Sequence, residues 1–215
     1  MIGKRYLKMQ FIDRDLLLED LPSQVDYNWL LGLMNSWIKI ESLPFKMGVL
    51  ATVDENGIPS SRTVAIREIN EHGFLFFTQL GSAKVTNFLV NPYVSFTFML
   101  PTTQRQISVF GRVSPLSESD NIKYWNTYDK ERRLRFLVYG TKSGRPIKKQ
   151  QELDEELVLL REQYQETLPE RPREYIGYMI IPQMIKFYQL NEHRLSDSIT
   201  AKSTQGMWSI QRCAP

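Results

Sequence analysis

The chain has 215 residues, a formal net charge of +3 and a single cysteine. Apolar residues make up 42% and charged residues 24% of it, as in a globular domain with a full hydrophobic core. One cysteine excludes an intrachain disulfide and fits a reducing, cytoplasmic location. No apolar run approaches the roughly 20 residues that cross a bilayer, and no secretory segment is expected. Basic residues are interleaved with acidic ones, so no membrane or nucleic-acid partner is predicted.

The first half of the chain predicts one helix followed by short strands. Residues 1–23 are charged and irregular and are expected to form an N-terminal arm, with residues 24–215 as a single domain. From Asp26 to Ile40 the apolar residues recur at helical spacing, which predicts an amphipathic helix. Strands joined by tight turns are expected next, with Asn-Gly at the tip of the first turn, at 49–53, 62–69 and 74–78.

The second half mixes helices with further strands. Ser82 is expected to cap a helix of about eight residues that ends before Pro92. Ser117 with Asp120 resembles a capping box for a helix through Tyr128. A one-sided surface helix is predicted within 147–166. Further strands are expected at 93–100, 106–113, 175–181, 184–190 and 207–212. This order predicts an α+β fold, an antiparallel β-barrel with peripheral helices.

Arg62 and Arg67 lie within six residues of one predicted strand. Guanidinium groups donate in a planar fork, which suits a phosphate. Their odd spacing places them on opposite faces of a regular strand. A single ligand could therefore meet both only at a barrel rim, a bulge or a subunit interface. The alternative is a pair of solvated strand charges.

Three further segments carry polar groups that suit an anionic ligand. Gly81-Ser82-Ala83-Lys84 opens a helix, where free N–H groups and the lysine attract anions, although its glycine spacing is not that of a Walker loop. Thr141 to Arg145 is a second polar turn, and the Gln106 amide could both donate a hydrogen bond to a ligand and accept one from it. An ordinary capped helix and an exposed strand glutamine are the alternatives. His193 with Glu192 supplies too few ligands for a metal, so none is expected.

In their order and spacing these segments resemble the pyridoxine/pyridoxamine 5'-phosphate oxidase family, which binds FMN, from about Leu21 to Pro215. The matching segments are 51–57, 62–67, 77–78, 81–82, 91–92, 105–106, 111–112, 123–124, 192–195 and 212–215. The resemblance implies a split antiparallel β-barrel of the FMN-binding type and a homodimer with FMN between its subunits. It also implies an FMN-dependent oxidase that converts pyridoxine or pyridoxamine 5'-phosphate to pyridoxal 5'-phosphate with oxygen as acceptor.

The resemblance assigns roles to individual residues. The FMN phosphate would be held by Arg62, Lys84 and Ser143, and the other cofactor-binding positions are Thr63, Val64, Ala65, Ile66, Arg67, Phe77, Thr78, Gln106, Lys142 and Tyr188. The substrate-binding positions are Arg67, Tyr124, Arg194 and Ser196: Arg67 and Tyr124 would meet the substrate phosphate, and Arg194 and Ser196 are also the catalytic candidates.

The chain departs from the family pattern mainly around the substrate. Arg67 replaces a lysine, Ala83 an arginine, Lys142 a glutamine, Tyr188 a tryptophan, Ser196 a histidine and Ser198 an arginine. Downstream of Tyr124 the family's arginine and serine have no clean equivalents, and Arg132 or Arg133 could compensate. These changes favour two alternatives: a split-barrel flavoprotein relative that acts on another substrate, and a flavin or pyridoxal-phosphate binding protein without turnover.

Overall fold

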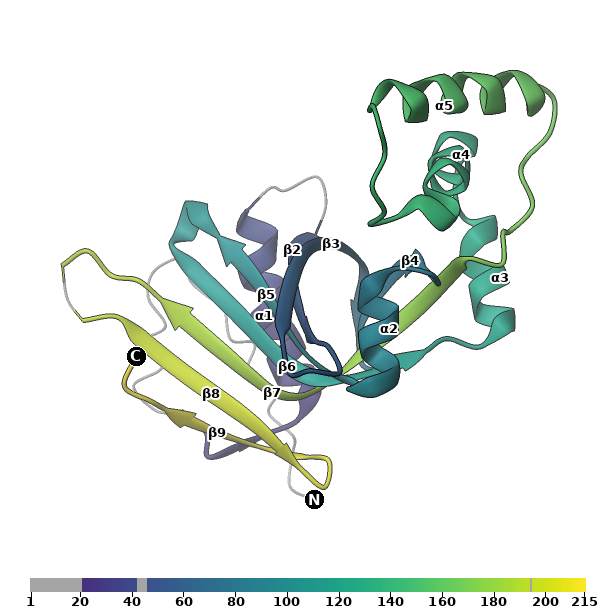
Figure 1. Ribbon diagram of the computed structural model, residues 1–215. Coiled ribbons are helices and arrows are strands. Elements are labelled where there is room, and N and C mark those ends of the chain that lie inside the picture. The colour runs from purple at the N-terminus through teal and green to yellow at the C-terminus, as the bar shows by residue number, and fades with distance from the viewer. Residues whose placement is uncertain (1–20, 42–45, 194) are drawn as a thin grey trace.

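The computed structural model describes residues 21–41, 46–193 and 195–215, so most of the expected N-terminal arm lies outside it (Figure 1). The strands are β1 (Gln24–Val25), β2 (Lys46–Val53), β3 (Pro59–Asn70), β4 (Gly73–Gln79), β5 (Tyr93–Leu100), β6 (Arg105–Pro115), β7 (Tyr175–Gln189), β8 (Asp197–Thr204) and β9 (Met207–Arg212). The helices are α1 (Tyr27–Ile40), α2 (Ala83–Val90), α3 (Glu118–Asn126), α4 (Lys130–Tyr139) and α5 (Gln151–Gln163), with short 3-10 turns at Pro101–Thr103 and Gly140–Lys142.

Six antiparallel strands close into a barrel in the order β7-β4-β3-β2-β5-β6, with β6 pairing back to β7. The 15-residue strand β7 belongs to two parts of the sheet. Its first half pairs with β4 as far as Ile180, and its second half pairs with β8 from Met184. Strands β8, β9 and β1 continue from there as an open wing. The predicted α+β split barrel with peripheral helices is confirmed.

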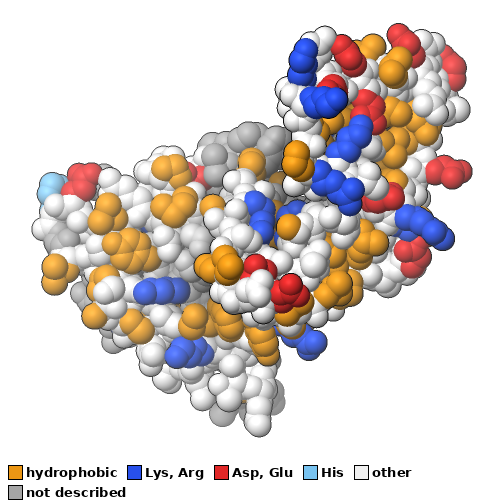
Figure 2. All heavy atoms as spheres, in the orientation of Figure 1, with side chains coloured by type: hydrophobic (Ala, Val, Ile, Leu, Met, Phe, Trp, Pro, Cys, Tyr) orange, Lys and Arg blue, Asp and Glu red, His pale blue; other side chains and the backbone are white. Residues whose placement is uncertain are grey.

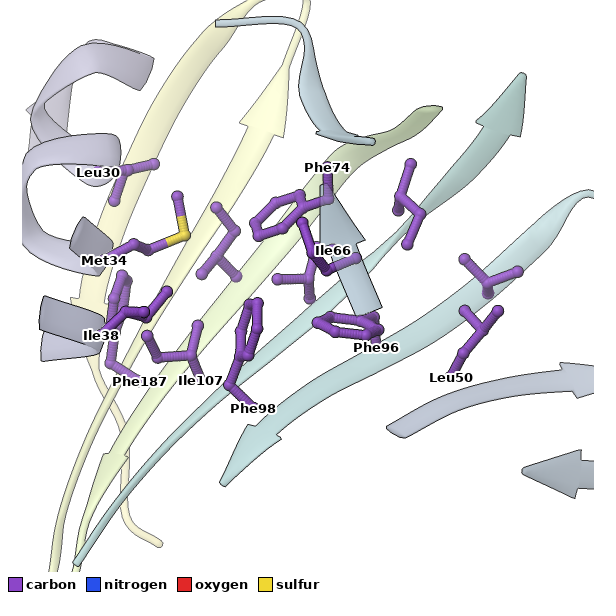
Figure 3. Close-up of a cluster of buried hydrophobic side chains, with 14 of the residues drawn as sticks. Leu30, Met34, Ile38, Leu50, Ile66, Phe74, Phe96, Phe98, Ile107 and Phe187 are labelled. Atoms are coloured by element: carbon purple, nitrogen blue, oxygen red, sulfur yellow. The ribbon is translucent and has the colours of Figure 1, made fainter. Parts of the chain in front are cut away.

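The barrel interior is an aromatic and aliphatic core against which α1 packs. Asp26 caps α1 by accepting a hydrogen bond from the Trp29 N–H at 2.8 Å, which confirms the predicted helix start. Figure 3 shows Met34 and Ile38 of α1 beside Phe187 of the barrel. All three side chains are buried. Burying each such side chain stabilises the fold by about 1.5–3 kcal/mol, so α1 and the barrel hold each other in place.

Helices α4 and α5 project together from one side of the barrel (Figure 1). A second buried cluster of Trp125, Tyr128 and Tyr175 joins this α4–α5 unit to the barrel. Within it the buried Arg133 donates to the carbonyls of Tyr128 and Pro169, both at 3.1 Å. Helix α5 has no buried residue, as expected of a surface helix. Across the described ranges, no helix has the length and apolar character needed to span a membrane.

Strands β8 and β7 are among the elements that differ from the sequence-based expectation. Strand β8 was not predicted, because its buried positions include Ser198 and Thr200 instead of a run of large apolar residues. Strand β7 was predicted as two strands but is continuous. Pro182 lies opposite Gly111, at a register shift in the β6–β7 ladder. A bulge tolerates a residue without an N–H, so the proline does not end the strand.

Gly111 is required at this bulge, because a Cβ there would lie 2.3 Å from the Ile181 carbonyl oxygen. We therefore expect Gly111→Ala to lower the free energy of unfolding by about 1–3 kcal/mol. Gly32→Ala is the matched control, since an added Cβ in this part of α1 meets no atom within 4 Å. It should raise the free energy of unfolding by about 0.5–1 kcal/mol. Urea denaturation measures both, and a Gly111→Ala protein of unchanged stability would contradict the close approach.

Candidate functional site

The barrel opens between β3 and β4, and the candidate site lies in this opening. Strand β3 pairs with β2 from Pro59 to Ile66 but with β4 only from Ile66 onward. The end of β4, from Phe77 to Gln79, pairs only with β7 among the described strands. The two strand edges that face each other here therefore have backbone groups outside any ladder, which a ligand can satisfy.

A cleft of about 600 Å³ occupies the opening. Its lining residues are Lys46, Arg62, Thr63, Val64, Ala65, Ile66, Arg67, Phe77, Thr78, Gln79, Lys84, Tyr128, Arg132 and Phe136. In Figure 2, lysine and arginine side chains are visible in the recess between the barrel and the α4–α5 unit. Such a cleft has the size of a cofactor or small-molecule site.

A bulge explains how Arg62 and Arg67 meet one cleft despite their odd spacing. The β3–β4 register shifts between Ile66 and Glu68, so Arg67 is the extra residue of the bulged strand. A bulge turns side chains away from strict alternation. Both arginines line the cleft. The bulge was one of three arrangements that the sequence left open.

Arg62 and Lys84 form the cationic end of the cleft. The Arg62 guanidinium donates to Thr52 Oγ1 and to Ser60 Oγ, both at 2.7 Å. The Lys84 Nζ donates to Thr78 Oγ1 at 2.9 Å and to Ser82 Oγ at 3.1 Å. All four acceptors are neutral hydroxyls. Within the described residues neither cation has a carboxylate within ion-pair distance.

The two cations carry an electrostatic penalty that a bound anion would relieve. Burial, and then the charge of Arg62, lowers the pKa of Lys84 to about 8. Burial also lowers the pKa of Arg62. Ser82 occupies the N-cap of α2, but its side chain makes no capping hydrogen bond to the helix. The positive end of α2 therefore adds to this end of the cleft, as at known phosphate sites.

Aromatic rings and Arg67 form the other end of the cleft, the aromatic end. The guanidinium of Arg67 lies 5.4 Å from the centre of the Tyr128 ring, and that of Arg132 lies 5.0 Å from it. Arg67 also donates to Thr127 Oγ1 at 3.2 Å. The ring of Phe77 stacks on Tyr175 at 4.8 Å and flanks the same space. Planar rings and guanidinium groups of this kind suit a flat heteroaromatic ligand.

Tyr124 lies beside this end, but its hydroxyl contacts Glu68 and not Arg67. The hydroxyl donates to the Glu68 carboxylate at 2.8 Å. Burial, and then the hydrogen bond to Glu68, raises the pKa of Tyr124 to about 12. The Tyr124 ring lies 5.3 Å from that of Phe77, which lines the cleft. The sequence placed Tyr124 here but gave no sign of Glu68, because their contact spans 56 positions.

The remaining predicted residues lie elsewhere on the subunit. Gln106 and Tyr188 are opposite each other in the β6–β7 ladder, on its outer face. The Tyr188 hydroxyl donates to Ser196 Oγ at 3.0 Å. None of these three lines the cleft, and the β7–β8 loop lies well away from α2 in Figure 1. Arg194 lies outside the described residues.

Lys142 and Ser143 line a smaller pocket of about 340 Å³ under α5. Gln79 borders both this pocket and the cleft. Lys142 forms an ion pair with Glu156 of α5. Sequence patterns did not assign three further cleft residues to the cofactor: Tyr128, Arg132 and Phe136. They come from α4 and the turn before it, which reach the cleft only through tertiary packing.

A split antiparallel barrel whose opening holds two half-buried cations and an aromatic wall is typical of a split-barrel protein that binds a planar, phosphorylated ligand. Residues 41–153 match the family described as pyridoxamine 5'-phosphate oxidase. The chain belongs to this family.

Curated relatives and solved structures agree with this assignment. A pyridoxine/pyridoxamine 5'-phosphate oxidase of Shewanella pealeana is 30% identical over 97% of both chains. One from Alteromonas mediterranea is 36% identical over 77% of this chain and 78% of that protein. The fold is similar to PhzG from Burkholderia lata, with a TM-score of 0.76 and 22% identity over 92% of this chain and 95% of that chain. A related FMN-binding protein of Nostoc punctiforme has a TM-score of 0.68 and 20% identity, over 86% and 96% of the two chains.

The family confirms FMN as the predicted cofactor, and the cleft fits it. The FMN phosphate is a dianion near neutral pH. Arg62 and Lys84 offer it two positive charges that no carboxylate neutralises within the described residues. The unpaired strand edges and Phe77 offer a polar and apolar border for a planar ring.

The lowered pKa of Lys84 gives FMN binding a pH dependence. Lys84 of the free protein loses its proton as the pH rises through about 8, and a dianion binds the protonated amine better. We expect the FMN affinity to fall as the pH rises above about 8 and to be flatter for Lys84→Met. Quenching of flavin fluorescence in titrations from about pH 7 to about pH 9 measures this. An identical decline in Lys84→Met would contradict the assignment.

The same shift has the opposite effect on the stability of the FMN-free protein. Between the folded pKa of about 8 and the ordinary value of 10.5, the unfolded chain holds more protons at Lys84 than the folded one. The contribution of Lys84 to the free energy of unfolding therefore rises with pH in this window. Urea denaturation of the FMN-free protein at several pH values, with Lys84→Met as reference, measures it.

Proposed function

We propose that the protein is an FMN-dependent oxidase that converts pyridoxine or pyridoxamine 5'-phosphate to pyridoxal 5'-phosphate, with oxygen as acceptor. The observation that carries the proposal is the half-buried pair of Arg62 and Lys84 at the end of a cleft with an aromatic wall. Support also comes from the curated relatives of that name over nearly the whole chain. A single cysteine supports a cytoplasmic location.

The residues of the cleft would position the cofactor. Arg62, Lys84 and the start of α2 hold the phosphate, with Ser143 and Lys142 approaching from the α5 side. The strand from Thr63 to Ile66, together with Phe77 and Thr78, borders the ring. FMN supplies the two-electron oxidation when bound, and the protein supplies orientation and electrostatics.

A second copy of the chain would complete the site. Gln106, Tyr188 and Ser196 cannot reach the cleft of their own subunit in the arrangement described above. The outer sheet face that carries Gln106 and Tyr188 also exposes large apolar side chains, among them Met47, Val49, Met99 and Phe110. Such a face needs cover, and a homodimer would provide it and bring these residues to the partner's cofactor.

Arg194 and Ser196 would act at the substrate, with Arg67 and Tyr124 on the other side of it. Ser196 can exchange one hydrogen bond but cannot carry the positive charge of a histidine. We therefore propose slower turnover than in a family member with histidine here, and Ser196→His should raise it.

A second candidate function is oxidation of another planar substrate on the same FMN scaffold. The bond between Tyr124 and Glu68 favours it, because the hydroxyl expected at the substrate phosphate is already donated to a carboxylate. PhzG, which shares the fold, has been solved in complex with tetrahydrophenazine-1-carboxylic acid.

Aerobic turnover of the purified yellow protein tests the proposal. Pyridoxine 5'-phosphate and pyridoxamine 5'-phosphate should each yield the aldehyde and hydrogen peroxide. Peroxide formed only with other reduced heteroaromatic compounds would favour the second candidate. A protein that binds FMN but oxidises no compound of either set would be a binding protein without turnover.

Arg62→Ala should weaken FMN binding by at least about 2 kcal/mol, because the phosphate loses a desolvated charge partner. Arg161→Ala is the matched control, since Arg161 pairs with Glu131 on the exposed surface of the α4–α5 unit. It should leave the affinity unchanged. Fluorescence titration with FMN compares the two, and equal affinities would contradict the phosphate site.

Mixed dimers test whether two subunits share the site. Arg62→Ala and Arg194→Ala chains should each have little activity alone. After joint refolding, half of the dimers would combine the two chains, and each would hold one intact site. The mixture should regain about one quarter of the activity of the unmodified protein. No regain, with dimers shown by light scattering, would place both residues in one subunit's site.

A further inference from the structure

Tyr124 is already engaged in the structure, and the residue that engages it is an acid. Its hydroxyl donates to Glu68 at 2.8 Å. Glu68 follows Arg67 directly, at the bulge where β3 leaves β4. Its side chain is half-buried, and the Tyr124 ring packs on Phe77 of the cleft wall. Glu68 therefore lies next to the position at which the proposed function needs a phosphate ligand.

Acids lie near this hydroxyl, whereas none pairs with the cations of the cationic end within the described residues. Burial and then the hydrogen bond to Glu68 raise the pKa of Tyr124, the charge of Asp120 raises it further, and that of Arg67 lowers it. Arg67 and Arg132, which lie over the Tyr128 ring, are the cations of this end of the cleft. At the other end Arg62 and Lys84 face the cleft with neutral hydroxyl partners. A dianion is favoured at the cationic end and opposed at Tyr124.

We propose that Glu68 is a specificity-determining residue that biases the substrate end of the cleft against a phosphate dianion. It does so by holding the Tyr124 hydroxyl and by placing a negative charge beside Arg67. Substrates whose group at this end is neutral or singly charged are favoured relative to phosphate esters. The inference rests on the proposed function in that the same cleft takes FMN and a ring substrate, and within it favours the second candidate, a planar substrate other than a phosphate ester, over the phosphorylated pyridoxines.

Glu68→Gln keeps the shape and an oxygen that accepts from Tyr124 but removes the charge. The ratio of kcat/KM for pyridoxine 5'-phosphate to kcat/KM for pyridoxine should rise by about tenfold or more. Only the kcat/KM of the phosphorylated compound should change. The same ratio is measured for binding of pyridoxal 5'-phosphate and pyridoxal, followed by protein fluorescence. FMN affinity should not change, because Glu68 is not among the residues of the cationic end.

Glu71→Gln is the matched control, since it removes one negative charge from the exposed β3–β4 turn, where Glu71 contacts only His72 among the described ion pairs. It should leave both ratios unchanged. A Glu68→Gln ratio within twofold of the unmodified protein, or an equal shift in Glu71→Gln, overturns the proposal. A wrong proposed function would give a different result. No variant would then bind FMN or show turnover, whatever the ratio of the affinities for pyridoxal 5'-phosphate and pyridoxal.

Discussion

The divergence of β3 from β4 is the constraint on which the candidate site depends. A closed barrel would pair these strands along their length, but they separate where β3 bulges after Ile66. The separation leaves backbone groups at two facing edges without ladder partners, which is costly unless a ligand or solvent satisfies them. The same bulge brings Arg67 into the cleft with Arg62. One irregularity in the ladder thus creates the opening and supplies part of its charge.

The half-buried cations at the base of the opening carry an electrostatic penalty that an anion would relieve. Burial, and then the charge of Arg62, lowers the pKa of Lys84, and burial lowers that of Arg62. Their geometry is nevertheless ordered, because the donors are held by Thr52 of β2, Ser60 of β3, Thr78 of β4 and Ser82 at the N-cap of α2. The two cations are thus already in position in the free protein, and binding of a phosphate relieves the electrostatic penalty of holding them there.

Local sequence patterns predicted what local physics determines. Helical spacing and Asp26 located α1, alternation located most barrel strands, and the anionic-ligand reading of Arg62 and Lys84 fits the cleft in which they meet. Contacts distant in sequence were not predictable from these patterns. The hydrogen bond from Tyr124 to Glu68 and the arrival of α4 at the cleft both depend on how α3, α4 and β3 pack. Strand β8 was missed because two of its four buried side chains, Ser198 and Thr200, are small and polar, so no apolar run marks it.

Strand β3 places opposite charges near the two ends of the cleft: Arg62 lines the cationic end, and Glu68 lies beside the aromatic end, where Arg67 and Arg132 line the cleft. Arg62 and Glu68 lie on β3 on either side of the bulge, one among hydroxyls and the other bonded to Tyr124. In a half-buried cleft, charges a few ångströms away outweigh the protein's small net charge. An elongated ligand with a single dianionic group therefore has one favourable orientation, with that group at Arg62 and Lys84. The cofactor phosphate and any substrate phosphate are therefore recognised at different ends of the cleft. The preference for a phosphorylated substrate can change while the preference for a phosphorylated cofactor is kept.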